Sequence, residues 1–307
     1  MLIYLVRRIP FILIVILGVS FLAFLLMQLS GDPAVMMLPA DASHDDILRM
    51  REQMGFDDPF FVQYGRFLYN FFVHFDLGRS FSFREPAMSV VLERMPNTLL
   101  LASLSMGFAI IVGVIIGLIA ANKRNSFIDY LVTWSAITIS SVPAFWLGLI
   151  LILVFSVNLG WFPSYGSGTP RHLVLPVLTL SAFYLALIAR LTRSGLLEVL
   201  SEDYIRTARA KGLIERLVVM KHALKNALIP LVTMMGMQFG RLIGGAVVTE
   251  TVFAWPGIGR LIVIAVNQRD FPLVQSALMM LALIFVFLNL VVDILYAYLD
   301  PRIKLGK

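Results

Sequence analysis

Long apolar stretches without charged residues constrain this chain more than any other feature. There is no Asp, Glu, Lys or Arg from Ile9 to Gly31, and none in the 41 residues from Tyr130 to Pro170. A helix needs about 20 apolar residues to cross roughly 30 Å of hydrocarbon. The mean hydropathy is +0.86 and only 14% of residues are charged, far too few for a soluble surface. The chain is therefore predicted to be an all-α integral membrane protein.

The apolar stretches predict six membrane-spanning helices, with Pro143 kinking the third. The first follows Arg7 and Arg8. It is too long for the apolar core of a signal peptide, so we expect it to be retained, with the N-terminus inside. The predicted spans are 9–31, 95–122, 130–157, 172–189, 226–249 and 271–298.

Glycines recur in two of these spans. Small side chains let helix backbones approach closely in a membrane. We therefore expect tight packing around the second span and tight packing or a moving interface around the fifth. The glycines are Gly107, Gly113 and Gly117 in the second span, and Gly236, Gly240, Gly244 and Gly245 in the fifth.

The basic residues predict how the spans are oriented. Six spans with both termini inside place most of the 25 Lys and Arg residues inside, nine outside, and Arg241 within a span. This bias agrees with the positive-inside rule, and it accounts for the net charge of +6 without a nucleic-acid partner. The inside residues are Arg7, Arg8, Lys123, Arg124, the eight from Arg190 to Lys225, Arg302, Lys304 and Lys307.

Residues 32–94 form a polar insertion between the first two predicted spans. Ser43 is suited to cap a helix that stops at Gly55, and Pro59 opens an aromatic-rich segment. The aromatic residues surround the expected helix, which favours a position at the membrane interface or against the bundle. The insertion is predicted to be a packed extracytoplasmic subdomain, which could also be a platform that contacts another protein outside the membrane.

A basic loop of about residues 198–225 separates the fourth and fifth predicted spans. It is predicted to form two short helices, 203–211 and 213–222, hinged at Gly212. A charged loop cannot lie in hydrocarbon, so it must meet something at the surface. That could be a soluble partner, or the basic residues could simply lie beside anionic lipid headgroups.

The basic loop resembles the cytoplasmic EAA loop of ATP-binding-cassette importer permeases. Ala208, Gly212 and Leu224 match the generic pattern of that loop. The stretches DYIRTARAKG (203–212) and KHALKNALIP (221–230) resemble its variant in dipeptide, oligopeptide and glutathione permeases. Further similar stretches cover nearly the whole chain: GDP at 31–33, DLG at 76–78, TRS at 192–194, TETVFAWPGIGR at 249–260 and VVDILYAYLDPRI at 291–303.

The resemblance implies the first permease subunit of a peptide importer in a bacterial inner membrane. Its parts would be a first span (1–31), an extracytoplasmic insertion (32–94) and a core permease domain (95–307). Expected partners are a second homologous permease, two ATPase subunits that hold ATP and Mg, and a substrate-binding protein outside. In this family the loop docks in a groove of the ATPase, which implies coupling roles for Tyr204, Ile205, Arg206, Thr207, Ala208, Arg209, Lys211, Gly212 and Leu213. Of these, Tyr204, Ile205, Ala208 and Leu213 are expected as apolar contacts.

The sequence shows no catalytic machinery. It contains no Walker A pattern, no HExxH or GxSxG motif and no cysteine, so we expect neither an enzyme nor a metal or cofactor site in this chain. Arg241, near Gln238, is expected to face the translocation pathway, to snorkel outward or to pair within the assembly, and Asp293 is expected to cap or pair with groups at the inner surface. Glu250 and Trp255 are expected at an outer gate, a docking surface or a structural turn.

Two alternatives stay open at this point. The same machinery could import nickel or an opine-like solute instead of a peptide. An ion-coupled secondary carrier would use intramembrane ionisable residues, and only Arg241 and Asp293 are available for that role. A third class, a scaffold for membrane assemblies, is disfavoured because such a protein would not need a hinged, charged loop.

Overall fold

The computed structural model describes residues 2–30, 34–35, 38 and 43–299. Within these residues the secondary structure is helical, apart from one isolated bridge between Arg79 and Pro86. The helices are α1 (Leu2–Ser30), α3 (His44–Met54), α4 (Phe60–Tyr69), η1 (Asn70–His74), α5 (Ala87–Asn122), α6 (Phe127–Ser141), α7 (Ala144–Leu151), η2 (Ile152–Asn158), α8 (Arg171–Leu200), α9 (Asp203–Ala210), α10 (Glu215–Leu217), η3 (Val218–Ala223), α11 (Leu224–Val252), α12 (Ile258–Asn267) and α13 (Phe271–Leu299).

The chain forms two compact units. The first combines the residues up to Asn97 with Pro256–Phe287. The second combines Thr98–Trp255 with the residues from Leu288 onward.

In the first unit, the insertion forms the two helices that the sequence predicts. The Ser43 hydroxyl accepts the Asp46 N–H, and the Asp46 carboxylate accepts the Ser43 N–H, so the start of α3 has a capping box. Gly55 ends α3 at a left-handed φ of 65°. The capped helix is therefore confirmed.

The aromatic helix α4 packs against α1. The Phe24 ring lies 5.3 Å from that of Phe60 and 5.6 Å from those of Tyr64 and Phe67. The hydroxyls of Ser20 and Tyr64 form a 2.8 Å hydrogen bond. This confirms that the aromatic segment packs on the first predicted span.

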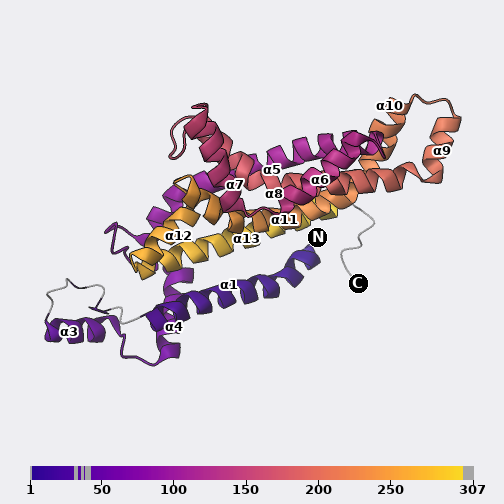
Figure 1. Ribbon diagram of the computed structural model, residues 1–307. Helices are drawn as coiled ribbons and strands as arrows, with labels where there is room; N and C mark the ends of the chain where they lie inside the picture. The colour runs from indigo at the N-terminus through magenta and orange to yellow at the C-terminus, as the bar shows by residue number, and fades with distance from the viewer. Residues whose placement is uncertain (1, 31–33, 36–37, 39–42, 300–307) are drawn as a thin grey trace. The chain divides into compact units, whose positions relative to one another are not determined.

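In the second unit, α8 is the central helix and packs against α6, α7 and α11 (Figure 1). The second predicted span lies in α5, which already begins at Ala87. A side chain added at Gly113 or Gly117 would meet α8, so this close approach is confirmed. On α11, the expected close packing is present at Gly236, where an added side chain would meet Val292. Gly244, by contrast, has open space beside it.

The third predicted span is not a continuous helix. It divides into α6 and a second segment, α7 with η2, which are bent by 107° relative to each other. Pro143 has no N–H to donate to a helical hydrogen bond. A proline also disfavours helical backbone angles in the residue before it, and Val142 is extended, with φ −85° and ψ 126°. The predicted kink therefore underestimated the bend, because Val142 and Pro143 both have non-helical backbone angles.

Several helices are long and apolar enough to cross a membrane. In the part of the chain that the structure describes there are four, and five if the bent pair counts as one. They lie in α1, α5, α8 and α13; α11, the predicted fifth span, is not among them. The structure thus supports a multi-pass membrane protein, and the number six stays a prediction.

Candidate coupling site

The basic loop lies at the end of two long helices of the second unit. Figure 1 shows α9 and α10 beyond the ends of α8 and α11. Helix α8 extends as far as Leu200, beyond the predicted end of the fourth span at residue 189. Then α9 runs to Ala210, the chain turns at Gly212, and α10 leads through η3 into α11 without a break. The loop is thus a folded element between two helices.

The turn at Gly212 closes α9 with a Schellman motif. The Leu213 N–H donates to the Ala208 carbonyl, and the Gly212 N–H donates to the Arg209 carbonyl. Gly212 itself is left-handed, with φ 78°. This is the bond pattern and the glycine position that define the motif, so the predicted left-handed break at Gly212 is confirmed.

A valine at Gly212 should loosen this turn. A side chain there would meet nothing within 4 Å, so the cost is conformational and amounts to roughly 1–2 kcal/mol. Hydrogen exchange at the Leu213 amide should therefore accelerate roughly 5- to 30-fold in Gly212→Val. Asparagine tolerates left-handed backbone, so Gly212→Asn should exchange almost like the unmodified chain. Equal acceleration in both variants would contradict this account.

A buried apolar cluster holds the loop to three long helices. Ile205 and Val218 are fully buried in it, one from each arm of the loop. Around them pack side chains from the ends of α5 and α8 and from the start of α11. The buried members are Ala121, Leu196, Ile205, Ala208, Val218, Val219, Ala223 and Ala227, and Leu213 packs against them.

One ion pair joins the two arms across Gly212. Arg209 donates from Nη2 to Oε1 of Glu215 at 2.7 Å and from Nε to Oε2 at 3.1 Å. These hydrogen bonds lower the pKa of Glu215 below its ordinary 4.5 and raise the pKa of Arg209 above its usual value. The stabilisation is therefore present above about pH 4.5 and is lost as pH falls through the lowered pKa of Glu215.

The apolar cluster contributes more to the loop's stability than this ion pair. The side chains of Arg209 and Glu215 are 43% and 60% exposed, and such pairs contribute about 0.2–1 kcal/mol. Burying a single isoleucine contributes about 1.5–3 kcal/mol. The loop is therefore held mainly by burial.

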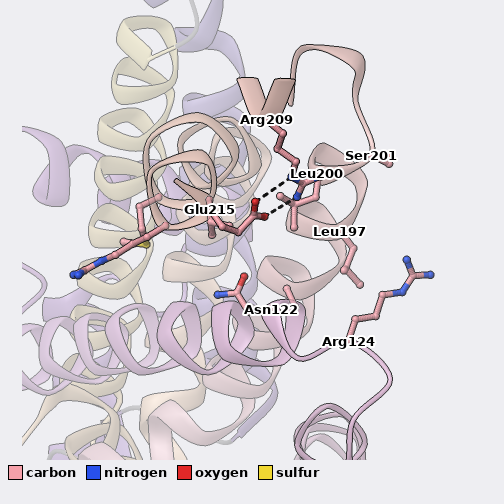
Figure 2. Close-up of a pocket in the computed structure, with 11 residues that line it drawn as sticks. Asn122, Arg124, Leu197, Leu200, Ser201, Arg209 and Glu215 are labelled. Atoms are coloured by element: carbon pink, nitrogen blue, oxygen red, sulfur yellow. Dashed lines mark hydrogen bonds and ion pairs between the residues drawn. The ribbon is translucent and has the colours of Figure 1, made fainter. Parts of the chain in front are cut away.

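The loop also forms one wall of a cleft of about 670 Å³. Figure 2 shows Asn122 and Arg124 on one side and the Arg209–Glu215 pair on the other. The lining residues are Ala121, Asn122, Arg124, Leu197, Leu200, Ser201, Arg209, Glu215, Arg216, Val219 and Met220.

The structure separates the predicted coupling residues into two groups. Ile205 and Ala208 are buried and hold the loop together, so they are not available on its surface as the predicted apolar contacts. Leu213 is half-buried against the same cluster. The exposed residues are Tyr204, Arg206, Thr207, Arg209, Lys211 and Gly212. The coupling role of the loop itself stays a prediction.

Comparisons with known proteins now identify the family. Residues 113–305 match the model of the binding-protein-dependent transport system inner membrane component, and residues 1–102 match the model of its N-terminal part. The chain belongs to this family. The first match includes the whole basic loop, so the permease carries it inside the family's common region.

Curated relatives extend over the full length of the permease. It is 46% identical to the glutathione transport system permease protein GsiC of Escherichia coli O6:H1, with 99% of each chain covered. It is 41% identical to the dipeptide transport system permease protein DppB of Alkalihalophilus pseudofirmus, covering 99% of this chain and all of the relative. A putative peptide transport system permease protein of Brucella abortus is 45% identical over 97% of this chain.

Solved structures support the fold. An inward-facing form of the methionine ABC transporter MetNI superposes with a TM-score of 0.59 at 21% identity, covering 69% of the permease and 97% of that chain. This likeness concerns the fold alone. With the family and the full-length relatives, it establishes the chain as a multi-pass permease of an ATP-binding-cassette importer, a membrane transport component rather than a catalytic subunit.

The predicted pathway residues do not form one cluster. Gln238 lines a small cavity between α5, α8 and α11, while Arg241, one turn further along α11, is exposed. Glu250 is fully buried and accepts a 2.6 Å hydrogen bond from Thr98. Trp255 is 4% exposed, and its N–H donates to the Glu250 carbonyl. Their pathway or gate roles stay predictions, and the side chain of Asp293 lies outside the described residues.

Two buried carboxylates connect parts of the chain that are distant in sequence, and neither was predicted to do so. Asp129 is 2% exposed and pairs with Arg193, whose Nη2 lies 2.7 Å from Oδ2. The pair joins the start of α6 to α8. The sequence signal for Asp129 was its position three residues after the capping Ser126.

Asp270 is the second of these carboxylates. It is fully buried and caps α13 by accepting the Leu273 N–H. It also accepts the Ser80 hydroxyl at 2.5 Å and the Ser82 N–H at 3.0 Å. The Asp-Phe-Pro sequence at the start of the last helix was a signal for the cap. Nothing near Asp270 in the sequence predicted its hydrogen bonds with Ser80 and Ser82.

Proposed function

We propose that this permease forms half of the translocation pathway for short peptides, including dipeptides and glutathione-like peptides, and that it is driven by separate ATPase subunits. The observation that carries the mechanism is the basic loop, a folded element tied by buried side chains to the ends of α5, α8 and α11. A partner that moves the exposed side of α9 would move these three helices together. The names of the full-length relatives support a peptide cargo.

The proposed assembly follows from the family. A second, homologous permease supplies the other half of the pathway, two ATPase subunits hold ATP and Mg inside, and a binding protein delivers peptide from outside. This chain contributes six spans, with both termini on the cytoplasmic side of a bacterial inner membrane. Residues 32–94 form the extracytoplasmic insertion, between the first span (1–31) and the core permease domain (95–307).

The proposed orientation can be tested by labelling, because the chain has no cysteine. Lys211 is exposed beside the turn at Gly212, and Ser167 is exposed in the segment between η2 and α8. In right-side-out vesicles, an impermeant thiol reagent should label Ser167→Cys and should reach Lys211→Cys only after permeabilisation. Labelling of Lys211→Cys from outside would overturn the topology.

The cargo can be tested with the reconstituted assembly. We expect dipeptide- or glutathione-loaded binding protein to stimulate ATP hydrolysis and peptide uptake in proteoliposomes. Stimulation by a nickel chelate or an opine, with none by peptides, would favour the alternative cargo. Peptide uptake without ATPase subunits, dependent on an ion gradient, would instead indicate a secondary carrier.

A further inference from the structure

The cleft beside the basic loop is lined partly by apolar side chains and partly by charged ones, among them two exposed arginines. Leu197 and Leu200 of α8 and Val219 and Met220 of η3 supply the apolar surface. Arg209 is paired with Glu215, so these two charges cancel. Arg124 and Arg216 are exposed and have no ion pair with any residue that the structure describes. Among the described residues the cleft therefore has two exposed guanidinium groups without an ion pair beside apolar surface, and the charge of Arg124 also acts on Asp129, which pairs with Arg193.

The position of the cleft relates it to the membrane. The hydrophobic helix α5 ends at Asn122, and Lys123 and Arg124 follow at once. Basic residues immediately after an apolar span lie at the level of the lipid headgroups. Arg124 therefore marks the headgroup level, and Arg216 reaches the same cleft from α10 in the basic loop.

We propose that this cleft binds the headgroup of an anionic phospholipid. A planar guanidinium group such as that of Arg124 or Arg216 suits a phosphodiester, because one such group can bind two of its oxygens with paired hydrogen bonds. Leu197, Leu200 and Met220 offer apolar surface for the adjoining part of the lipid. Basic pockets between spans on the cytoplasmic side are known to select such headgroups.

The chemistry of the cleft favours a lipid over an acidic segment of a partner protein. A protein carboxylate would need only the guanidinium groups, whereas an amphipathic lipid also covers the apolar lining, at the depth where lipid is present. The bound lipid would touch both arms of the loop, at Arg209 and at Glu215 with Arg216. It would therefore stabilise the geometry of the loop.

The test uses the purified full chain in nanodiscs, so it does not depend on the transport cargo or on the ATPase. One set contains phosphatidylcholine alone and the other adds phosphatidylglycerol. We expect native mass spectrometry to show retained phosphatidylglycerol, and the Tm to be higher in the second set. Arg124→Gln combined with Arg216→Gln should weaken retention roughly 30-fold, since each basic residue near the surface contributes about 1 kcal/mol.

Two matched variants keep the result interpretable. Lys221→Gln with Lys225→Gln removes the same charge from exposed positions outside the cleft and should retain the lipid. Arg124→Lys with Arg216→Lys keeps the positive charge but removes the planar guanidinium groups. This variant should bind phosphatidylglycerol with intermediate strength. If the Gln pair does not fold, this Lys pair still tests the proposal, because lipid retention equal to that of the unmodified chain would overturn it.

Other occupants have distinct signatures. If inorganic phosphate in phosphatidylcholine nanodiscs raises the Tm as much as phosphatidylglycerol does, the cleft binds a soluble anion and the lipid proposal is wrong. If the Gln pair retains phosphatidylglycerol fully but no longer assembles with ATPase subunits, the cleft is a protein contact and the proposal is equally wrong.

Discussion

Replacing Gly117 by alanine should sharply reduce the amount of folded permease. A Cβ at this position would lie 2.5 Å from the Ala189 carbonyl oxygen and 2.7 Å from Thr192 Cβ. Real Cβ atoms do not approach other atoms this closely, and a backbone oxygen cannot rotate away. Overpacking of this kind typically costs about 1–3 kcal/mol, a large fraction of the stability of a typical protein. Thermal unfolding in detergent measures the effect.

Gly107 provides the matched control in the same helix. A Cβ there meets nothing within 4 Å, so Gly107→Ala should be neutral or more stable by up to about 1 kcal/mol, because alanine favours helix. Gly113→Ala should fall between the two, since its nearest new contact is the Ile188 side chain at 2.8 Å. If Gly117→Ala and Gly107→Ala had the same Tm, α5 and α8 would not pack as described.

Truncating Ile205 should disable the basic loop while the permease still inserts. Its side chain is fully buried between the two arms, and Ile→Ala substitutions in such places cost about 2–5 kcal/mol. The exposed Arg209–Glu215 pair cannot offset that loss. We expect faster hydrogen exchange throughout α9 and, in the reconstituted importer, loss of most peptide-stimulated ATP hydrolysis.

Ile214→Ala is the appropriate comparison. It removes the same atoms from the same loop, but this side chain is 70% exposed. Its exchange pattern and stimulated ATP hydrolysis should stay near those of the unmodified permease. Full stimulation in Ile205→Ala, with α9 demonstrably loosened, would mean that the loop does not transmit force from the ATPase.

Features determined by neighbouring residues could be predicted from the sequence. Ser43 and Gly55 delimit α3, and Gly212 ends α9, because capping and left-handed turns depend on residues a few positions apart. The apolar stretches likewise predicted α1, α5, α8 and α13 as candidate spans. These signals are local, because each depends on residues that are near one another in the sequence.

Features that depend on distant residues could not be predicted. The spacing on α9 groups Ile205 and Ala208 on one face, but only the fold shows that this face is covered by α5, α8 and η3. Asp270 is separated in sequence from Ser80 and Ser82 by nearly two hundred residues. The bend at Pro143 has a local cause instead: it exceeded the expected kink because Val142, the residue before the proline, also leaves the helix.

The Asp270 carboxylate has a mechanical consequence for the segment that precedes α5. Through Ser80 and Ser82 it fastens the end of the insertion to the first turn of α13. This junction excludes water, so breaking it would leave a bare carboxylate in the interior. While these hydrogen bonds hold, the stretch around Ser80 and Ser82 and the first turn of α13 would move as one piece.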